Sequence, residues 1–190
     1  AVAALGSAGF WCIMVWRPLT RTGAQIIVAC SLSVLGVVAF VALIVVEPPD
    51  IDVISVGEEG ADALRRGENP YAVVVVEDTN PFVPEGSTFD GYVYPPVTLV
   101  GYSASYWIFG DIRWASVIAI GVFILLLGGP WRAKAGSASK MGPASALAFV
   151  LLPMLGPLLR HGWTEPLAMP LLAGAALSWR KRPILAALLL

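Results

Sequence analysis

The stretch EPPDIDVISVGEEGADALRRGENPYAVVVVEDTNPFVPEGSTFDGYVYPP, residues 47–96, decides the fold, because it is polar and lies between long runs that carry no charge. Of the thirteen acidic residues in the chain, twelve lie between Glu47 and Asp111, and only Glu165 lies elsewhere. A polar segment between apolar runs is typical of a loop that connects membrane spans. We therefore expect residues 47–113 to form one large loop outside the membrane.

The rest of the chain has the composition of a membrane protein. Of its 190 residues, 57% are hydrophobic and 13% are charged, whereas soluble domains carry about 25% charged residues. A helix needs about 20 apolar residues to cross a bilayer, and shorter ones are known. Internal runs without charge lie at residues 22–46, 114–131, 141–159 and 166–179. Because uncharged segments also stand at both chain ends, we expect a fragment of a longer multi-span protein.

The basic residues predict which span ends face the cytoplasm, because Lys and Arg near span ends prefer that side. Arg17 and Arg21 lie between the first two apolar runs, so the span at about residues 23–46 should deliver the acidic loop to the outside. Further spans are expected at about residues 114–129, 142–159 and 167–179, with another beginning near Pro183. The predicted fold class is an all-α polytopic bundle, divided into two spans (1–46), the outer loop (47–113) and further spans (114–190).

Residues 91–110 are uncharged and have two interpretations. They are long enough to span, but their tyrosines, their serines and Trp107 are also typical of a segment at the level of the lipid headgroups. If the segment lies on the surface, the basic links at 131–140 and 180–182 face the cytoplasm. If it spans, both links move to the outside. The positive-inside rule favours the surface position.

Local signals predict short elements within the outer loop. Ser55 followed by Glu58 has the form of a capping box, and Gly67 is a good helix stop, so a helix is expected from about Val56 to Arg66. A turn at Asn69-Pro70 and a brief extended run at residues 73–76 should follow.

Two kinds of residue in this loop are candidates for chemistry. A carboxylate at Asp50 or Asp52 could act as a general base, although acids also commonly mark a membrane boundary. Arg113, Arg160 and His161 are cations of the outer face, and arginine suits phosphate through paired hydrogen bonds. The alternative for Arg113 is an ion pair with Asp111.

Two further groups have weaker signals. His161 and Glu165 are four residues apart, but one His with one Glu is a poor metal site, so neither a metal nor another cofactor is expected. Several aromatic residues could stack on sugar rings or simply anchor the chain at the membrane surface: Tyr71, Tyr92, Tyr94, Trp107 and Trp163.

Several short motifs together resemble a known family. Asp52-Val53, ADALRRGENPY (61–71), GYVYPP (91–96), FGDIRW (109–114) and GWTEP (162–166) resemble, in this order, the polytopic glycosyltransferases of the GT-C superfamily, in particular the family 87-like type of actinobacteria. The resemblance covers roughly residues 47–180. The chain departs from the pattern just after Asp52, where many relatives carry an aromatic residue.

The resemblance implies a multi-pass enzyme of the bacterial plasma membrane that moves a sugar, with inversion, from a polyprenyl-phosphate donor to a lipid-linked or cell-envelope glycan acceptor. It implies Asp52 as the catalytic base, with Asp50 second. It also implies substrate-binding residues that surround the base: Asn69, Tyr71, Tyr94, Arg113, Arg160, His161 and Glu165. Membrane lipids are expected partners, and nucleic acid is not.

Two other classes fit the same composition. A lipid or glycan transporter or flippase would carry ionisable residues within its spans, and the predicted spans contain none. A non-catalytic membrane scaffold would use the acidic loop to bind a partner, and would tolerate Asp52→Asn.

Overall fold

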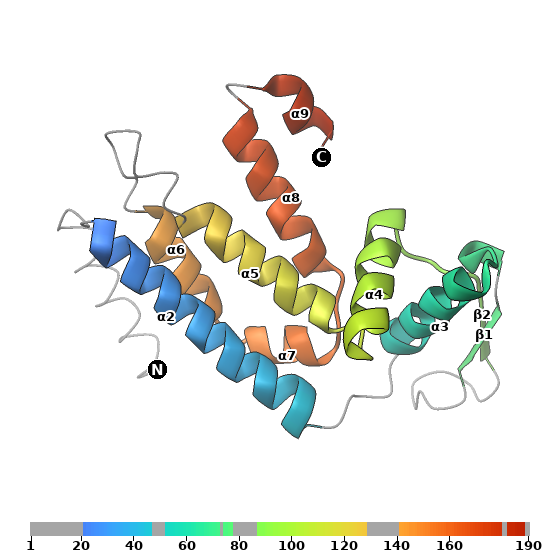
Figure 1. Cartoon of the computed structure of the whole chain (residues 1–190). Coiled ribbons are helices and arrows are strands. Elements are labelled where there is room, and N and C mark those ends of the chain that lie inside the picture. The colour runs from blue at the N-terminus through green and yellow to red at the C-terminus, as the bar shows by residue number, and fades with distance from the viewer. Residues whose placement is uncertain are drawn as a thin grey trace. The chain divides into compact units, whose positions relative to one another are not determined.

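The computed structural model describes residues 21–46, 52–72, 74–77, 87–128, 141–179 and 182–188, so the predicted second base, Asp50, lies outside the described residues. The described chain is mostly helical, as expected, and contains one short antiparallel strand pair, β1 (Val74–Glu77) with β2 (Ser87–Asp90). The helices shown in Figure 1 are α2 (Arg21–Phe40), α3 (Asp52–Arg66), α4 (Pro96–Phe109), α5 (Trp114–Gly128), α6 (Met141–Val150), α7 (Leu155–Arg160), α8 (Glu165–Ser178) and α9 (Pro183–Leu188).

The chain divides into two compact units. The first unit comprises Ala1–Val38, Gly121–Leu155 and Pro170–Leu190, and the second comprises Ala39–Ile120 and Gly156–Met169. Every described candidate residue of the predicted site belongs to the second unit. The two units are therefore treated separately below.

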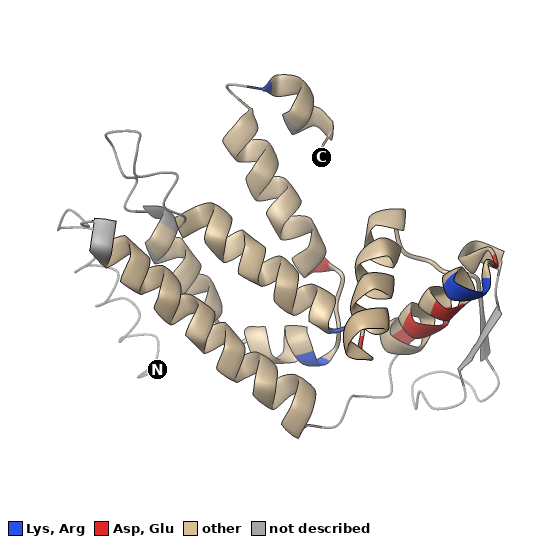
Figure 2. Ribbon diagram, viewed as in Figure 1, with Lys and Arg blue, Asp and Glu red and all other residues tan. Residues whose placement is uncertain are grey.

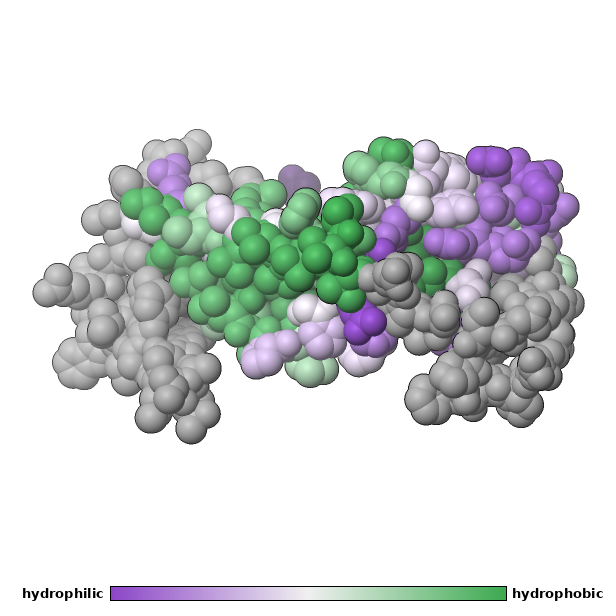
Figure 3. Space-filling view, turned by 90° about the horizontal axis from the view of Figure 1, so that it is seen from below, coloured by the Kyte–Doolittle hydropathy of each residue, from purple (hydrophilic) through white to green (hydrophobic). Residues whose placement is uncertain are grey.

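The α2 helix supplies the clearest candidate for a membrane span. Gly23–Val45 is 23 residues long with a mean hydropathy of 2.8, and much of its surface is apolar (Figure 3). In the described part of the chain it is the one helix long and apolar enough to cross a membrane. The α4 and α5 helices would make a second span only if both were counted together across their bend of 110°. The multi-span bundle therefore stays a prediction.

The segment expected to span at about residues 142–159 is not one helix, because α6 ends at Val150 and a new helix, α7, begins at Leu155. Pro153 lies in the turn between them. Proline lacks an N–H group and its ring clashes with the carbonyl group four residues earlier, which ends a helix. The sequence contains this signal, although the apolar composition obscures it.

The α3 helix organises the second unit and begins earlier than the capping box predicts. Asp52 occupies its first turn, where a negative charge favours the helix dipole. The predicted stop at Gly67 is confirmed: the residue has φ +75°, and Glu68 N donates to Ala63 O at 2.9 Å. This is a Schellman ending, which needs a residue in the left-handed region. In Figure 2 the acidic residues of α3 are coloured red along its ribbon and the basic ones blue near its end.

Small residues let α4 approach α3 closely. A Cβ atom on Gly57 would lie 2.6 Å from Ile112 Cδ1, and one on Gly60 would lie 2.6 Å from Tyr92 Cδ2. Larger side chains at these positions would therefore separate the elements. The core formed in this way contains buried residues from α3, from α4 and from the segments that flank α4: Val56, Tyr92, Leu99, Tyr102, Ile112 and Ala115.

The segment after α3 returns the chain to the start of α4. A 3₁₀ turn, η2 (Pro70–Ala72), follows α3, and Tyr92 N donates to Pro70 O at 2.9 Å. Gly91 has φ +83°, and a Cβ atom there would lie 2.2 Å from Tyr71 O. Only glycine satisfies both the conformation and the space at this position.

We expect Gly91→Ala to destabilise the second unit by about 2–4 kcal/mol, because it adds a left-handed conformational cost to a backbone clash. Gly67→Ala is the matched control: it also has positive φ, but nothing lies within 4 Å of the added atom. Thermal unfolding in lipid nanodiscs should therefore rank native protein first, Gly67→Ala second and Gly91→Ala last. Equal losses in the two variants would contradict the clash.

Candidate functional site

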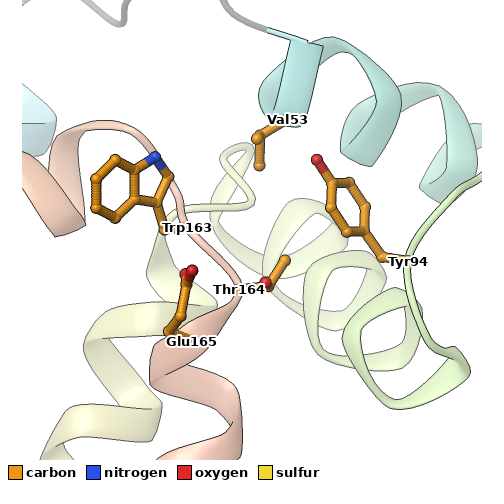
Figure 4. Close-up of a pocket in the computed structure, with 5 residues that line it drawn as sticks. All are labelled: Val53, Tyr94, Trp163, Thr164 and Glu165. Atoms are coloured by element: carbon orange, nitrogen blue, oxygen red, sulfur yellow. The ribbon is translucent and has the colours of Figure 1, made fainter.

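A pocket of about 240 Å³ opens within the second unit. It is lined by Val53 of α3, Tyr94 before α4, and the three consecutive residues Trp163, Thr164 and Glu165 at the start of α8. In Figure 4 the Trp163 and Tyr94 rings lie on opposite sides, and the Glu165 carboxylate and Thr164 lie between them. The pocket therefore joins two aromatic walls to a carboxylate and a hydroxyl group.

Two buried hydroxyl groups hold the main chain of residues 162–163. The Tyr102 hydroxyl, from α4, donates to Gly162 O, and Ser116 Oγ, from α5, donates to Trp163 O at 3.2 Å. Tyr102 and Ser116 are both fully buried. The loop that carries Trp163 and Glu165 is thus fixed by contacts to its backbone.

A row of three tyrosines positions the opposite wall. The Tyr71 and Tyr92 rings meet edge to face with centroids 5.7 Å apart, and the Tyr92 and Tyr94 rings do so at 5.6 Å. The Tyr71 hydroxyl also donates to Tyr94 O at 3.2 Å. Burial raises the pKa of Tyr92, as do the neighbouring Tyr71 and Tyr94, so the Tyr92 hydroxyl stays neutral. Tyr71, a predicted substrate-binding residue, therefore helps to position Tyr94 through this hydrogen bond.

Asp52 directly precedes Val53, which lines this pocket. Its Oδ1 atom accepts a hydrogen bond from Val53 N at 2.9 Å, which fixes the carboxylate at the start of α3. Asn69, by contrast, follows the other end of this helix, whose 15 residues span about 22 Å. Its side chain accepts a hydrogen bond from Tyr71 N at 3.1 Å and so shapes a turn. One small ligand cannot touch both Asp52 and Asn69.

The Arg113 guanidinium is almost completely buried and is held by Asp111. Its Nε lies 2.9 Å from Asp111 Oδ2, and its Nη2 lies 2.6 Å from the same oxygen. It also donates from Nη1 to Ala42 O at 3.3 Å and from Nη2 to Leu43 O at 3.2 Å. These carbonyl groups belong to the π-helical turn η1 (Val41–Val45) that ends the α2 segment, where carbonyls lack partners within the helix.

These contacts bear on the predicted role of Arg113. A guanidinium has five N–H groups, and four of them are engaged here. A bidentate grip on phosphate would need two free groups. The arrangement therefore matches the alternative, an ion pair with Asp111, and leaves Arg160 and His161 as the other predicted cations.

Arg160 and His161 lie at the end of α7, next to the pocket loop. Arg160 is half-buried, and within the described residues its Nε–H has no hydrogen-bond partner. His161 Nδ1 lies 2.7 Å from Pro157 O, and since a carbonyl oxygen can only accept, Nδ1 carries the proton. The His161 and Trp163 rings are in contact, with centroids 5.8 Å apart.

The structure thus brings together part of the predicted set. Tyr94 and Glu165 line one pocket, Asp52 precedes the lining residue Val53, and Asn69 follows the other end of α3. From the sequence, Trp163 is expected only to stack on a sugar or to anchor the chain at the membrane surface, and no role is predicted for Thr164 or Val53. The motif GWTEP contains both Trp163 and Thr164, and Val53 adjoins Asp52, so proximity to motif residues is the signal that could have found them.

Comparison of the chain with models of protein families, with curated protein sequences and with solved structures finds no match. Any function proposed for the chain therefore depends on the residues of the second unit.

We expect Arg113→Met to lower the free energy of unfolding by about 3–5 kcal/mol, because it removes the guanidinium that pairs with Asp111 and that donates to two backbone carbonyls. Arg66→Met is the matched control. Arg66 also pairs with carboxylates, Glu59 and Glu68, but its side chain is 45% exposed, so its loss should cost far less than that of Arg113. Thermal unfolding in nanodiscs measures both changes. An effect of Arg113→Met as small as that of Arg66→Met would contradict a stabilising role for the buried Arg113–Asp111 pair.

Glu58 gives the second unit a specific response to pH. Burial raises its pKa above the ordinary 4.5, and the neighbouring Asp111 raises it further. A raised pKa means that the folded protein holds this proton to higher pH than the unfolded chain does. The resulting stability is present below pH 4.5 and is lost as the pH rises through the folded-state pKa.

We therefore expect Glu58→Gln to melt at a higher temperature than native protein at pH 7.5, with the difference shrinking toward pH 4. Glu59→Gln, which removes an exposed pair with Arg66, serves as the control. A Glu58→Gln variant that melts below native protein at pH 7.5 would overturn this assignment.

Proposed function

We propose that the chain belongs to a membrane glycosyltransferase that transfers a sugar from a polyprenyl-phosphate donor to a lipid-linked or cell-envelope glycan, with Asp52 as general base. One observation carries the proposal: Asp52 is held by the main chain of Val53, and Val53 lines a pocket with two aromatic side chains and the Glu165 carboxylate. Aromatic faces with a few polar groups are the usual lining of small-molecule sites. The apolar α2 segment supports a place beside lipid, where a polyprenyl chain resides.

The proposed reaction needs one base and one leaving group. The Asp52 carboxylate takes the proton of an acceptor hydroxyl group, and that oxygen attacks the anomeric carbon of the donor sugar. The bond from this carbon to the phosphate oxygen breaks, and polyprenyl phosphate leaves with the electron pair. A single displacement of this kind inverts the anomeric centre. Glu165 is placed to accept hydrogen bonds from hydroxyl groups of the bound sugar.

The leaving phosphate needs a cation, and Arg160 is the candidate we favour. The Arg160 Nε–H has no protein partner in the described part of the chain. Arg160 lies three positions before Trp163 in the sequence. His161 follows it, and its Nδ1 is occupied by Pro157 O, so only Nε2 faces other partners. We give Arg113 a structural role instead, because its N–H groups donate to Asp111 and to two carbonyl groups of η1.

The test uses the protein in membranes, with a panel of radiolabelled polyprenyl-phosphate sugars. Asp52→Asn should reduce transfer at least about 100-fold, the lower range for loss of a general base. Asp62→Asn is the matched control, since it lies on the same helix ten residues further on. It should keep transfer within about twofold of native.

Expression and insertion of all variants are checked by blotting of washed membranes. Transfer that survives Asp52→Asn would remove this residue as the base. An absence of transfer from every donor would reject the glycosyltransferase and favour the transporter or scaffold instead.

A further inference from the structure

We infer that the pocket lined by Tyr94, Trp163 and Glu165 binds a single uncharged sugar ring, with one face of the ring stacked on Trp163. The inference rests on the proposed function and deepens it, because it names the kind of sugar and the residue that selects it. Trp163 is thereby a specificity-determining residue.

The walls of the pocket fit a sugar ring. One face of a pyranose carries C–H groups and prefers an aromatic surface, while its edge carries hydroxyl groups. Trp163 is 37% exposed although it is large and apolar, and in Figure 4 it forms one wall of the pocket opposite Tyr94. Glu165 and Thr164, between these rings, supply polar partners for the hydroxyl edge.

The charge of the lining excludes anionic sugars. Among the described residues that line the pocket, Glu165 is the one that carries a charge. In the part of the chain that the structure describes, no ion pair engages Glu165. Its carboxylate repels the carboxylate of a uronic acid, whereas a neutral sugar hydroxyl group donates a hydrogen bond to it. The sugar ring that enters is therefore uncharged, while the donor phosphate lies outside the pocket.

The size of the pocket suits one ring. Its volume of about 240 Å³ lies below the range of roughly 300–1,000 Å³ that is typical of sites for drug-sized ligands. The pocket loop is also fixed by the Tyr102 and Ser116 hydroxyl groups, so the Trp163 wall is in place before the ligand arrives. A preformed wall lowers the entropic cost of binding.

The experiment measures binding without transfer. Purified full-length protein in nanodiscs is examined by saturation-transfer NMR with a panel of neutral methyl pyranosides (gluco, galacto and manno), with methyl glucuronoside and with choline. We expect saturation of the ring C–H protons of at least one neutral glycoside and none of the glucuronoside. Trp163→Ala should weaken this binding about tenfold, and Trp163→Phe should restore most of it.

Trp179→Ala is the matched control, because Trp179 is an exposed tryptophan outside the pocket, and it should bind as native protein does. Binding of choline in place of the glycosides would make the pocket an ammonium site and overturn the inference. Glycoside binding unaffected by Trp163→Ala, or no binding of any probe, would overturn it as well.

The same samples separate this inference from the proposed function. Trp163-dependent sugar binding without transfer from any donor would reject the enzyme and keep the sugar site. Transfer that depends on Asp52 but not on Trp163 would keep the enzyme and reject this sugar site.

Discussion

The buried ion pair between Arg113 and Asp111 is the interaction on which the rest of the second unit depends. A buried guanidinium is costly unless its N–H groups find partners, and here one carboxylate and two backbone carbonyls supply them. Because those carbonyls belong to η1, the pair ties this turn to the segment between α4 and α5 within the second unit. The stem of Arg113 also packs on Gly162, since a Cβ atom there would lie 3.3 Å from Arg113 Cγ.

Close packing between α3 and its neighbours then positions the residues that line the pocket. Gly57 and Gly60 bring α3 against α4, which places Val53, near the start of α3, in the lining of the pocket. On the other side, three edge-to-face tyrosine rings determine where Tyr94 lies. The pocket is therefore the meeting point of elements that are each fixed by contacts elsewhere, and its side chains need no direct contact with one another.

The sequence predicts those features that depend on local chemistry. Gly67 ends α3 as expected, and the extended run near Val74 forms β1, because both signals act within a few residues. The sequence also indicates two interpretations of Arg113, phosphate binding and an ion pair with Asp111, and the structure contains the ion pair.

Features that depend on distant contacts are not readable in this way. The hydrogen bond from Tyr102 to Gly162 O, for example, joins residues 60 positions apart in the chain. The break between α6 and α7 was readable from Pro153, but the apolar composition around it outweighs a single proline in any count of hydropathy.

The hold on the pocket loop has a consequence for how such a protein can diversify. Tyr102 and Ser116 grip backbone oxygens, which every amino acid possesses, so the path of the loop does not depend on the identity of the side chains at 163–165. The side chains at 163–165 can therefore be changed together while the backbone of the loop keeps its path. Gly162 is the exception, because its φ of +62° and the adjacent Arg113 restrict it to glycine. Directed evolution aimed at a new ligand should therefore randomise residues 163–165 and leave Gly162 unchanged.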